Sequence, residues 1–242
     1  LDNEIKNYIK NIKTTKGYKE ILFFGKYIKW PVRKFGNVSS NDSFSINQMI
    51  YYSYYFNHRK KYKVVADFGS HTGEDAIFMS KCGYSVHAYE PDKSSFNLLK
   101  KNVSLNDCKK ITIVNKAISN NNQNLEFVNV KGNTLANHVS NSRNFYGDYN
   151  VQIVQAQDFN DLRFKPDLMK INIEGFEKIL IPAIKKSYWN NTDSFLELHG
   201  KKCAEIVLNY CKNFNLNIYS QKISWNKAKK IVDLPLNWSE GC

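Results

Sequence analysis

The chain has 242 residues, 42% of them hydrophobic and 14% aromatic, which is enough to bury one large core and excludes wholesale disorder. Its formal net charge is +13, but 31 of the 35 basic residues are lysines; because arginine supplies the forked contacts to bases and phosphates, this bias disfavours a nucleic-acid partner. The five cysteines lack C-x-x-C spacing, which argues against a zinc site or a disulfide framework and favours reduced thiols in a cytoplasmic protein: Cys82, Cys108, Cys203, Cys211 and Cys242.

Residues 1–62 form a basic, aromatic-rich segment with 12 Lys or Arg against 4 Asp or Glu. An amphipathic helix is predicted over residues 2–19, because apolar side chains recur there at helical spacing: Ile5, Tyr8, Ile9 and Ile12. It would dock on the protein's own body or on a partner, and peripheral contact with a membrane surface stays open. A second helix is predicted over residues 46–57. Lysines interrupt the apolar residues too often for a signal peptide, and no stretch is long enough to be a transmembrane helix.

Residues 64–92 have the pattern of a strand, a glycine loop, a helix and a second strand. The first strand ends at Asp67, the loop contains Gly69 and Gly73, and the second strand ends at Glu90. Ligands of open parallel sheets bind outside the carboxyl ends of the strands. Asp67 and Glu90 are therefore expected to lie where a nucleotide-like cofactor binds.

The loop spacing bears on which cofactor binds. A dinucleotide site needs G-x-G-x-x-G, whose central glycine lets the backbone approach a pyrophosphate. Here the spacing is Gly69-x-x-x-Gly73, and His71 stands in the place of the central glycine. That side chain obstructs a pyrophosphate but not S-adenosyl-L-methionine (SAM), which has no phosphate, and Glu90 can accept both ribose hydroxyls. The pattern favours SAM over NAD, with a generic nucleotide-type unit as the alternative.

The rest of the chain continues as alternating helices and strands. A helix over residues 94–106, N-capped by Ser94, is followed by strands at 111–114, 125–130 and 151–154. The Asn- and Ser-rich stretch 132–150 is expected to be a mobile loop, either a flap over the site or a plain surface loop. Further strands are expected at 168–173 and 194–198, helices at 179–189 and 201–213, and two last strands at 216–219 and 231–234.

Four motifs in this order resemble the FkbM family of SAM-dependent methyltransferases: DFGSHTG (67–73), YEPD (89–92), NKAIS (115–119) and KINIEGFE (170–177). The resemblance covers residues 64–200. It implies a Rossmann-like class I SAM-dependent methyltransferase fold, with a mostly parallel seven-stranded sheet and helices on both faces. It implies two domains. Residues 63–242 would form the SAM-binding methyltransferase domain, and residues 1–62 would form a helical extension that covers the acceptor. The cofactor-binding residues expected are Asp67, Gly69, Ser70, His71, Gly73, Glu90, Pro91, Asn115, Ala117 and Asn172.

Asn172 departs from the family, which usually carries Asp at this position. Carboxylates hold Mg²⁺ or Ca²⁺ better than amides do, so no metal is expected here. For catalysis, His199 is the candidate base because a histidine titrates near neutral pH, and Glu174 is expected to align the acceptor. Glu177 and Glu197 stand behind them. A His199 that only hydrogen-bonds the end of its strand is the alternative.

The predicted function is SAM-dependent O-methylation of a sugar hydroxyl, or a related group, in a glycan or cell-surface precursor, with S-adenosyl-L-homocysteine (SAH) as product. The acceptor class follows from the resemblance alone, and the basic extension suits an anionic acceptor. Two rivals stay open. One is an RNA methyltransferase, favoured by the charge; the other is a SAM-fold protein that serves as a binding subunit without catalysis.

Overall fold

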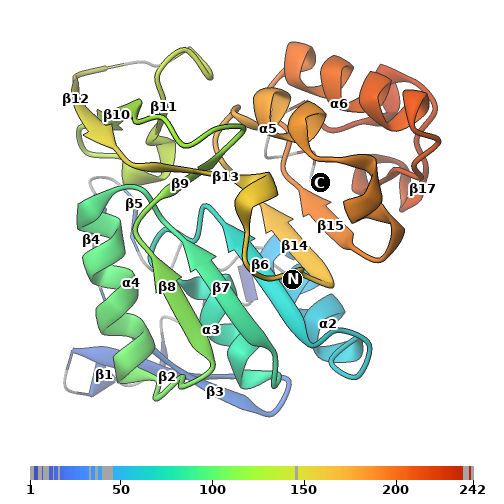
Figure 1. The fold of residues 1–242 in the computed structure, drawn as a ribbon. Coiled ribbons are helices and arrows are strands. Elements are labelled where there is room, and N and C mark those ends of the chain that lie inside the picture. Colours follow the sequence, from blue (N-terminus) through green and yellow to red (C-terminus); the bar gives the residue numbers. More distant parts are fainter. Residues whose placement is uncertain are drawn as a thin grey trace.

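The computed structural model describes residues 3–4, 7, 11–12, 14–15, 17–32, 34–35, 38–39, 46–144, 147–236 and 240. Its centre is a parallel sheet of five strands in the order β15-β14-β6-β7-β8, which confirms the predicted Rossmann-like α/β class (Figure 1). The strands are short apolar runs, as expected of parallel strands covered on both faces. Their bounds are Val64–Phe68 (β6), Ser85–Tyr89 (β7), Ile111–Val114 (β8), Leu168–Ile171 (β14) and Asp193–Leu196 (β15).

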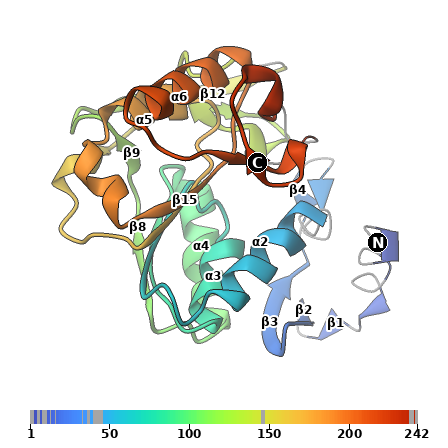
Figure 2. The same ribbon diagram turned by 90° about the vertical axis from the view of Figure 1, so that its right-hand side faces the viewer.

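Helices cover both faces of this sheet because successive side chains of a strand point to opposite faces. Val65 packs on one face in a cluster with α3 (Glu74–Lys81) and α4 (Lys93–Leu105). Ala66, the next residue, packs on the other face with α5 (Glu177–Ala183) and α6 (Lys201–Asn213). Figure 2 shows α5 and α6 above β15, and α2 and α3 below it. No helix in the described part of the chain is long and apolar enough to cross a membrane.

Two predicted helix boundaries are wrong, and each has a local cause. The N-cap of α4 is Asp92 and not Ser94, since the Asp92 carboxylate accepts a hydrogen bond from the backbone N–H of Ser95 at 2.7 Å. The helix predicted over 179–189 begins earlier, at Glu177, so Pro182 lies in its last turn. It ends at Ala183, and a 3-10 helix, η3 (Lys186–Asn190), follows.

The described sheet has five strands where seven were expected. Residues 216–219 contribute only β16 (Tyr219–Ser220), which pairs with β17 (Asn226–Lys227) through the turn η4 (Gln221–Ile223). The strand expected at 231–234 is the 3-10 helix η5 (Ile231–Asp233). The Asp233 carboxylate accepts the N–H groups of Lys229 and Lys230, both at 2.8 Å, and so closes a turn there. β15 is therefore an edge strand of the described sheet.

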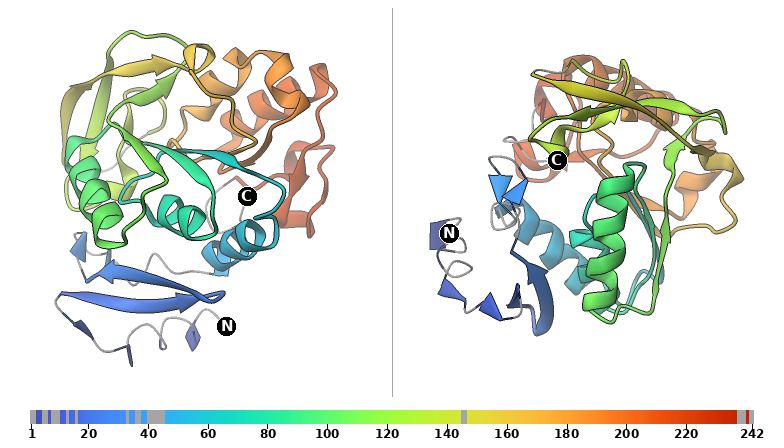
Figure 3. Two further views of the ribbon diagram at one scale, coloured as in Figure 1. Left: turned by 60° about the horizontal axis from the view of Figure 1, so that its bottom comes forward. Right: turned by 90° about the vertical axis from the view of Figure 1, so that its left-hand side faces the viewer.

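The N-terminal segment is only partly helical, where a helix was predicted over residues 2–19. The described residues Asn3, Glu4, Asn7 and Asn11 are helical, as expected. Ile5, Tyr8 and Ile9 lie outside the described residues, and Tyr18 begins a strand instead of continuing a helix. β2 (Tyr18–Phe23) and β3 (Lys26–Pro31) form an antiparallel hairpin whose two turn residues, Phe24 and Gly25, both have positive φ. β1 (Thr14–Thr15) pairs with β2, and β4 (Lys34–Phe35) pairs with β5 (Val38–Ser39). In the right-hand view of Figure 3, α4 lies between this hairpin and the sheet.

The helix predicted over 46–57 is present as α2 (Ile46–Asn57), and it belongs to the central core. Tyr52 and Tyr55 are buried in the same cluster as Val65 of β6. The ring of Tyr52 stacks on Phe78 of α3 with 4.1 Å between the centroids. The boundary predicted at residue 62 is therefore crossed by one continuous core.

Replacing Tyr52 with alanine is expected to lower the free energy of unfolding by about 3–5 kcal/mol, the usual cost of removing a buried aromatic ring. The side chain is only 1% exposed, so its loss leaves a cavity against Phe78. Urea denaturation measures the difference. Tyr27→Ala is the matched control, because Tyr27 lies in the same N-terminal region and is 63% exposed. Equal stability of the two variants would show that α2 is a separable cover.

An insertion follows the sheet strand β8. β9 (Ala117–Ser119) pairs in parallel with β13 (Ala156–Asp158), which runs into η2 (Phe159–Asp161). Between them, β10 (Leu125–Val130) pairs on one side with β11 (His138–Val139) and on the other with β12 (Tyr149–Val154). The stretch 132–150, expected to be a mobile loop, thus contains β11 and the 3-10 helix η1 (Thr134–Ala136).

Candidate functional site

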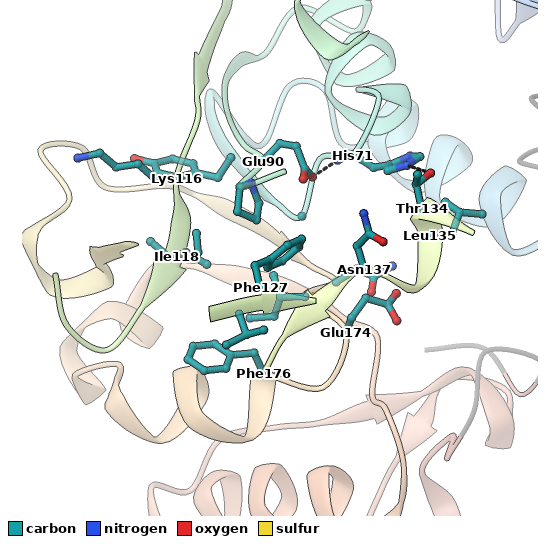
Figure 4. Close-up of a pocket in the computed structure, with 17 residues that line it drawn as sticks. His71, Glu90, Lys116, Ile118, Phe127, Thr134, Leu135, Asn137, Glu174 and Phe176 are labelled. Atoms are coloured by element: carbon teal, nitrogen blue, oxygen red, sulfur yellow. Dashed lines mark hydrogen bonds between the residues drawn. The ribbon is translucent and has the colours of Figure 1, made fainter. Parts of the chain in front are cut away.

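A pocket opens at the carboxyl ends of β6, β7 and β14 and is bounded by the insertion (Figure 4). Its wall is formed by the loop after each of these strands and by side chains of β9, β10, η1 and β11. Lining residues from the strand ends are Gly69, His71, Tyr89, Glu90, Pro91, Asn172, Ile173, Glu174 and Phe176. Those from the chain between β8 and β12 are Lys116, Ala117, Ile118, Phe127, Thr134, Leu135, Asn137 and Val139.

The loop after β6 needs its two glycines for packing. At Gly69, with φ of 83°, a Cβ atom would lie 1.9 Å from the carbonyl oxygen of Asn172. At Gly73, with φ of 92°, it would lie 2.4 Å from Cδ1 of Leu99. The Ser70 hydroxyl donates to the backbone of the preceding strand at 2.7 Å and closes the turn. Gly69 therefore lets the loop lie directly against the end of β14, which brings the ends of these two strands into one site, and Gly73 lets it pack on α4.

Glu90 lies at the tip of β7, where the sequence predicts a ribose contact. Its carboxylate accepts the backbone N–H of His71 at 2.8 Å and that of Asp92 at 2.9 Å. Burial raises the pKa of Glu90 to about 8. The side-chain amide of Asn115 donates to the Glu90 carbonyl at 2.8 Å and so holds the backbone of this turn. Each carboxylate oxygen can accept more than one hydrogen bond, so Glu90 can also receive two hydroxyl groups from a ligand in the pocket.

The two ends of the pocket differ in polarity. In Figure 4, Ile118, Phe127 and Phe176 gather at one end, while His71 and Glu174 lie toward the other. The apolar end suits a planar base, and the polar end suits an amino-acid group, with Glu90 between them. The side chain of His71 contacts the insertion through Nε2 and the Thr134 hydroxyl at 3.0 Å.

Asp67 does not line the pocket, although a cofactor contact was predicted for it. It faces inward beside Lys170 of the neighbouring strand, with 3.5 Å between Oδ1 and Nζ. Burial raises the pKa of Asp67, and the charge of Lys170 opposes that rise. The Lys170 ammonium also lies 3.5 Å from Asp75, whose other oxygen accepts a hydrogen bond from Gln48 of α2 at 2.8 Å. Asp67 therefore supports the cofactor loop from below.

Six of the ten predicted cofactor residues line the pocket: Gly69, His71, Glu90, Pro91, Ala117 and Asn172. The other four shape it from behind: Asp67, Ser70, Gly73 and Asn115. Sequence reasoning missed the insertion residues Phe127, Thr134, Leu135 and Asn137. Phe127 lies in a predicted strand, and its large apolar side chain is the one local signal there. The other three stand in a polar stretch that carries no periodic pattern.

The two predicted catalytic residues come together at the ends of β14 and β15. Nε2 of His199 lies 3.4 Å from Oε2 of Glu174, and Nδ1 lies 3.4 Å from Oε1 of Glu177. Glu177 also accepts the backbone N–H groups of Ile173 and Gly175, which fixes the turn that carries Glu174. Of the three residues Glu174, Glu177 and His199, Glu174 is the one that lines the pocket. No cluster of three or more potential metal ligands occurs among the described residues.

The structure changes the premise on which His199 was predicted to be a base. Burial alone would lower its pKa, but the carboxylates of Glu174 and Glu177 outweigh burial and raise it to about 10. The imidazole is therefore protonated at neutral pH. Glu174, which pairs with both His199 and Arg143, has its pKa lowered against the opposing effect of burial. At neutral pH the pocket thus presents a carboxylate backed by an imidazolium.

This ion pairing predicts a pH-dependent stability. The folded-state pKa of His199 is raised to about 10 from an ordinary 6.5, so its charge stabilises the fold fully below pH 6.5 and loses that effect as pH rises toward 10. The stability difference between wild type and His199→Gln should therefore shrink over this range in urea titrations. His87→Gln is the control, since burial lowers the pKa of His87. A His199 difference that does not change with pH would contradict the pairing.

A parallel sheet with a glycine loop after one strand and a carboxylate at the tip of the next defines a Rossmann-like cofactor-binding protein. Residues 67–202, more than half of the chain, match the family described as the methyltransferase FkbM domain. The chain belongs to this family, which confirms the predicted cofactor, SAM. None of the curated protein sequences compared with the chain matches it.

Among solved structures, the chain is similar to a SAM-dependent methyltransferase from Agrobacterium tumefaciens, at 12% identity and a TM-score of 0.34 over 43% of this chain and 34% of that one. It is also similar to TYW2 from M. jannaschii in complex with AdoMet, at 10% identity and a TM-score of 0.45 over 86% and 78%. A third is the M. jannaschii tRNA m1G37 methyltransferase, at 13% identity and a TM-score of 0.40 over 83% and 49%. The matched region spans about a third of the length of the first of these proteins. The family assignment rests on the sequence match.

Proposed function

We propose that this chain transfers the methyl group of SAM to a hydroxyl oxygen of a sugar or related group in a glycan or cell-surface precursor. The observation that carries the proposal is Glu174, a carboxylate paired with an imidazolium and facing the pocket. Such a group can receive a hydroxyl proton next to a bound methyl donor.

The residues present fit SAM. Glu90 would hold the ribose hydroxyls, and the apolar end of the pocket around Ala117 and Phe127 would hold the adenine. Gly69 and Asn172 would hold the methionine end. The side-chain oxygen of Asn172 supports this assignment, since it is buried at the pocket without a hydrogen-bond partner among the described residues. When bound, the cofactor supplies an electrophilic methyl group.

Glu174 accepts the hydrogen bond of the acceptor hydroxyl and so points an oxygen lone pair at the methyl carbon. The new carbon–oxygen bond would form as the bond between the methyl carbon and the sulfonium sulfur breaks and SAH leaves, while the Glu174 carboxylate takes the hydroxyl proton. His199 contributes from behind. Held by Glu177, it fixes the Glu174 carboxylate in one orientation and keeps it ionised when no acceptor is bound. The base is therefore Glu174, and His199 is a positioning residue.

The acceptor class is supported by the family resemblance and by the small number of basic groups in the pocket. Lys116 is the one Lys or Arg among the described lining residues, although the chain contains 35. Arg143 lies nearby but is paired with Glu174. An RNA acceptor is the second candidate, because the net charge of +13 favours a polyanion.

The test supplies SAM with a labelled methyl group together with oligosaccharides of defined composition or, in parallel, unmodified tRNA. Label is expected in the saccharide as a methyl ether, with one SAH formed for each methyl group transferred. Label in tRNA would move the assignment to RNA. Binding of SAM without transfer to either acceptor would favour the non-catalytic reading.

A further inference from the structure

The side chain of Asn172 is held in one orientation by Glu197, which directly follows the neighbouring strand β15. Its amide nitrogen donates to Oε2 of Glu197 at 2.9 Å, and its backbone N–H donates to the Phe68 carbonyl at 3.1 Å. An amide group has a donor end and an acceptor end, whereas an ionised carboxylate only accepts. Glu197 therefore dictates that the nitrogen of Asn172 faces it and that the oxygen faces away.

The side-chain oxygen of Asn172, which faces away from Glu197, is buried at the pocket wall. It has no hydrogen-bond partner among the residues that the structure describes. Buried polar atoms in proteins are nearly always paired, so this one points to a ligand. A ligand group that pairs with it must be a donor. Asn172 lies against Gly69, at the end of the pocket where the proposed function places the methionine part of the cofactor. The donor at that end is the α-ammonium group.

Resting on the proposed cofactor, we infer that Glu197 orients Asn172 so that the amide oxygen accepts a hydrogen bond from the α-ammonium group of SAM. A single Asp would supply both a hydrogen-bond acceptor and a negative charge, and here these two properties come from two residues. Asn172 supplies the acceptor, and Glu197 supplies the negative charge behind it. Burial raises the pKa of Glu197, and Glu174 and Glu177 add to that rise. The positive charges of His199, whose Nε2 lies 3.9 Å from Oε1, and of Lys170 oppose it and favour the ionised carboxylate.

A charge exchange tests this inference. Glu197→Gln offers Asn172 a partner that can also donate, so the amide can turn and present its nitrogen to the ammonium. Affinity for SAH, measured by calorimetry, should fall roughly tenfold. Asn172→Asp combined with Glu197→Gln restores one acceptor-only group and one donor, and it should bind SAH within about threefold of wild type. Glu205→Gln, on the exposed surface of α6, is the matched control.

A second ligand separates orientation of the amide from general damage. 5′-Deoxy-5′-methylthioadenosine keeps the adenosine but lacks the amino-acid part, so Glu197→Gln should leave its affinity unchanged. Equal weakening of both ligands, without recovery in the double variant, would show that Glu197 only supports the strand end. Wild-type affinity for SAH in Glu197→Gln would also overturn the inference. A wild-type protein that binds neither ligand would remove the proposed cofactor site, and the inference with it.

Discussion

Replacing Glu90 with alanine is expected to weaken SAH binding by about 2–4 kcal/mol, the size of two charge-assisted hydrogen bonds. The carboxylate is buried and holds the turn after β6 through the N–H of His71, as well as its own turn through the N–H of Asp92. Its removal would therefore cost both the proposed ribose contact and the hydrogen bonds that shape the pocket wall. Calorimetry with SAH measures the loss, and unchanged affinity would remove Glu90 from the site.

The same carboxylate predicts the pH dependence of binding. Burial raises the pKa of Glu90 to about 8, so in most molecules of the ligand-free protein this carboxyl group is protonated at pH 7. Two hydroxyl donors favour the ionised form, so wild-type affinity for SAH should rise as pH increases from 7 to 9. Glu90→Ala should lack this rise. Glu126→Ala, an exposed carboxylate in β10, is the control and should behave as wild type.

Glu174→Gln is expected to reduce turnover by about 10²–10⁴-fold, the usual contribution of a positioned base. The amide keeps the size of the side chain but cannot take the hydroxyl proton, and it loses its ionic contact with His199. SAH affinity should change far less than turnover, because Glu174 is assigned to the acceptor. Single-turnover kinetics at saturating SAM separate the two effects.

The two residues can be distinguished by their pH profiles. With Glu174 as the base, His199→Asn should retain part of its activity, since His199 acts by holding Glu174 in place. The activity of that variant should fall at a higher pH on the acid side, because Glu174 loses the partner that lowers its pKa. An inactive His199→Asn beside a fully active Glu174→Gln would return the role of base to His199.

Local signals in the sequence were sufficient for the β-loop-α-β unit that forms one wall of the pocket. β8, β10 and α6 have the predicted bounds, because each combines a clear apolar pattern with a terminator. Glu90 and the loop of Gly69 lie within one β-loop-α-β unit. When two strands separated by one helix pair in parallel, their carboxyl ends lie at the same edge of the sheet. This placement does not depend on the rest of the chain.

The extension shows where local pattern failed. The helical spacing of residues 2–19 correctly predicted helix at Asn3, Glu4, Asn7 and Asn11, but Tyr18 and Lys19 are in β2. The positive φ of both Phe24 and Gly25 permits a two-residue hairpin turn, and the hairpin buries Ile21 and Ile28 against the core. Tertiary packing outweighed helical propensity at this point, which spacing alone does not reveal.

The sequence by itself determined the class of fold, the cofactor loop and the carboxylate at the tip of β7, since these depend on residues within about thirty positions of one another. Only the tertiary structure decided which residues close the pocket and which of Glu174 and His199 faces it. It also decided which atom of the Asn172 side-chain amide lies toward the pocket. Asn172 meets Glu197, and His199 meets Glu174, only because β14 and β15 pair in parallel. Burial and neighbouring charges then set the pKa of His199 and the direction of the Asn172 amide, and both are properties of an assembled site, which residue types and spacing do not contain.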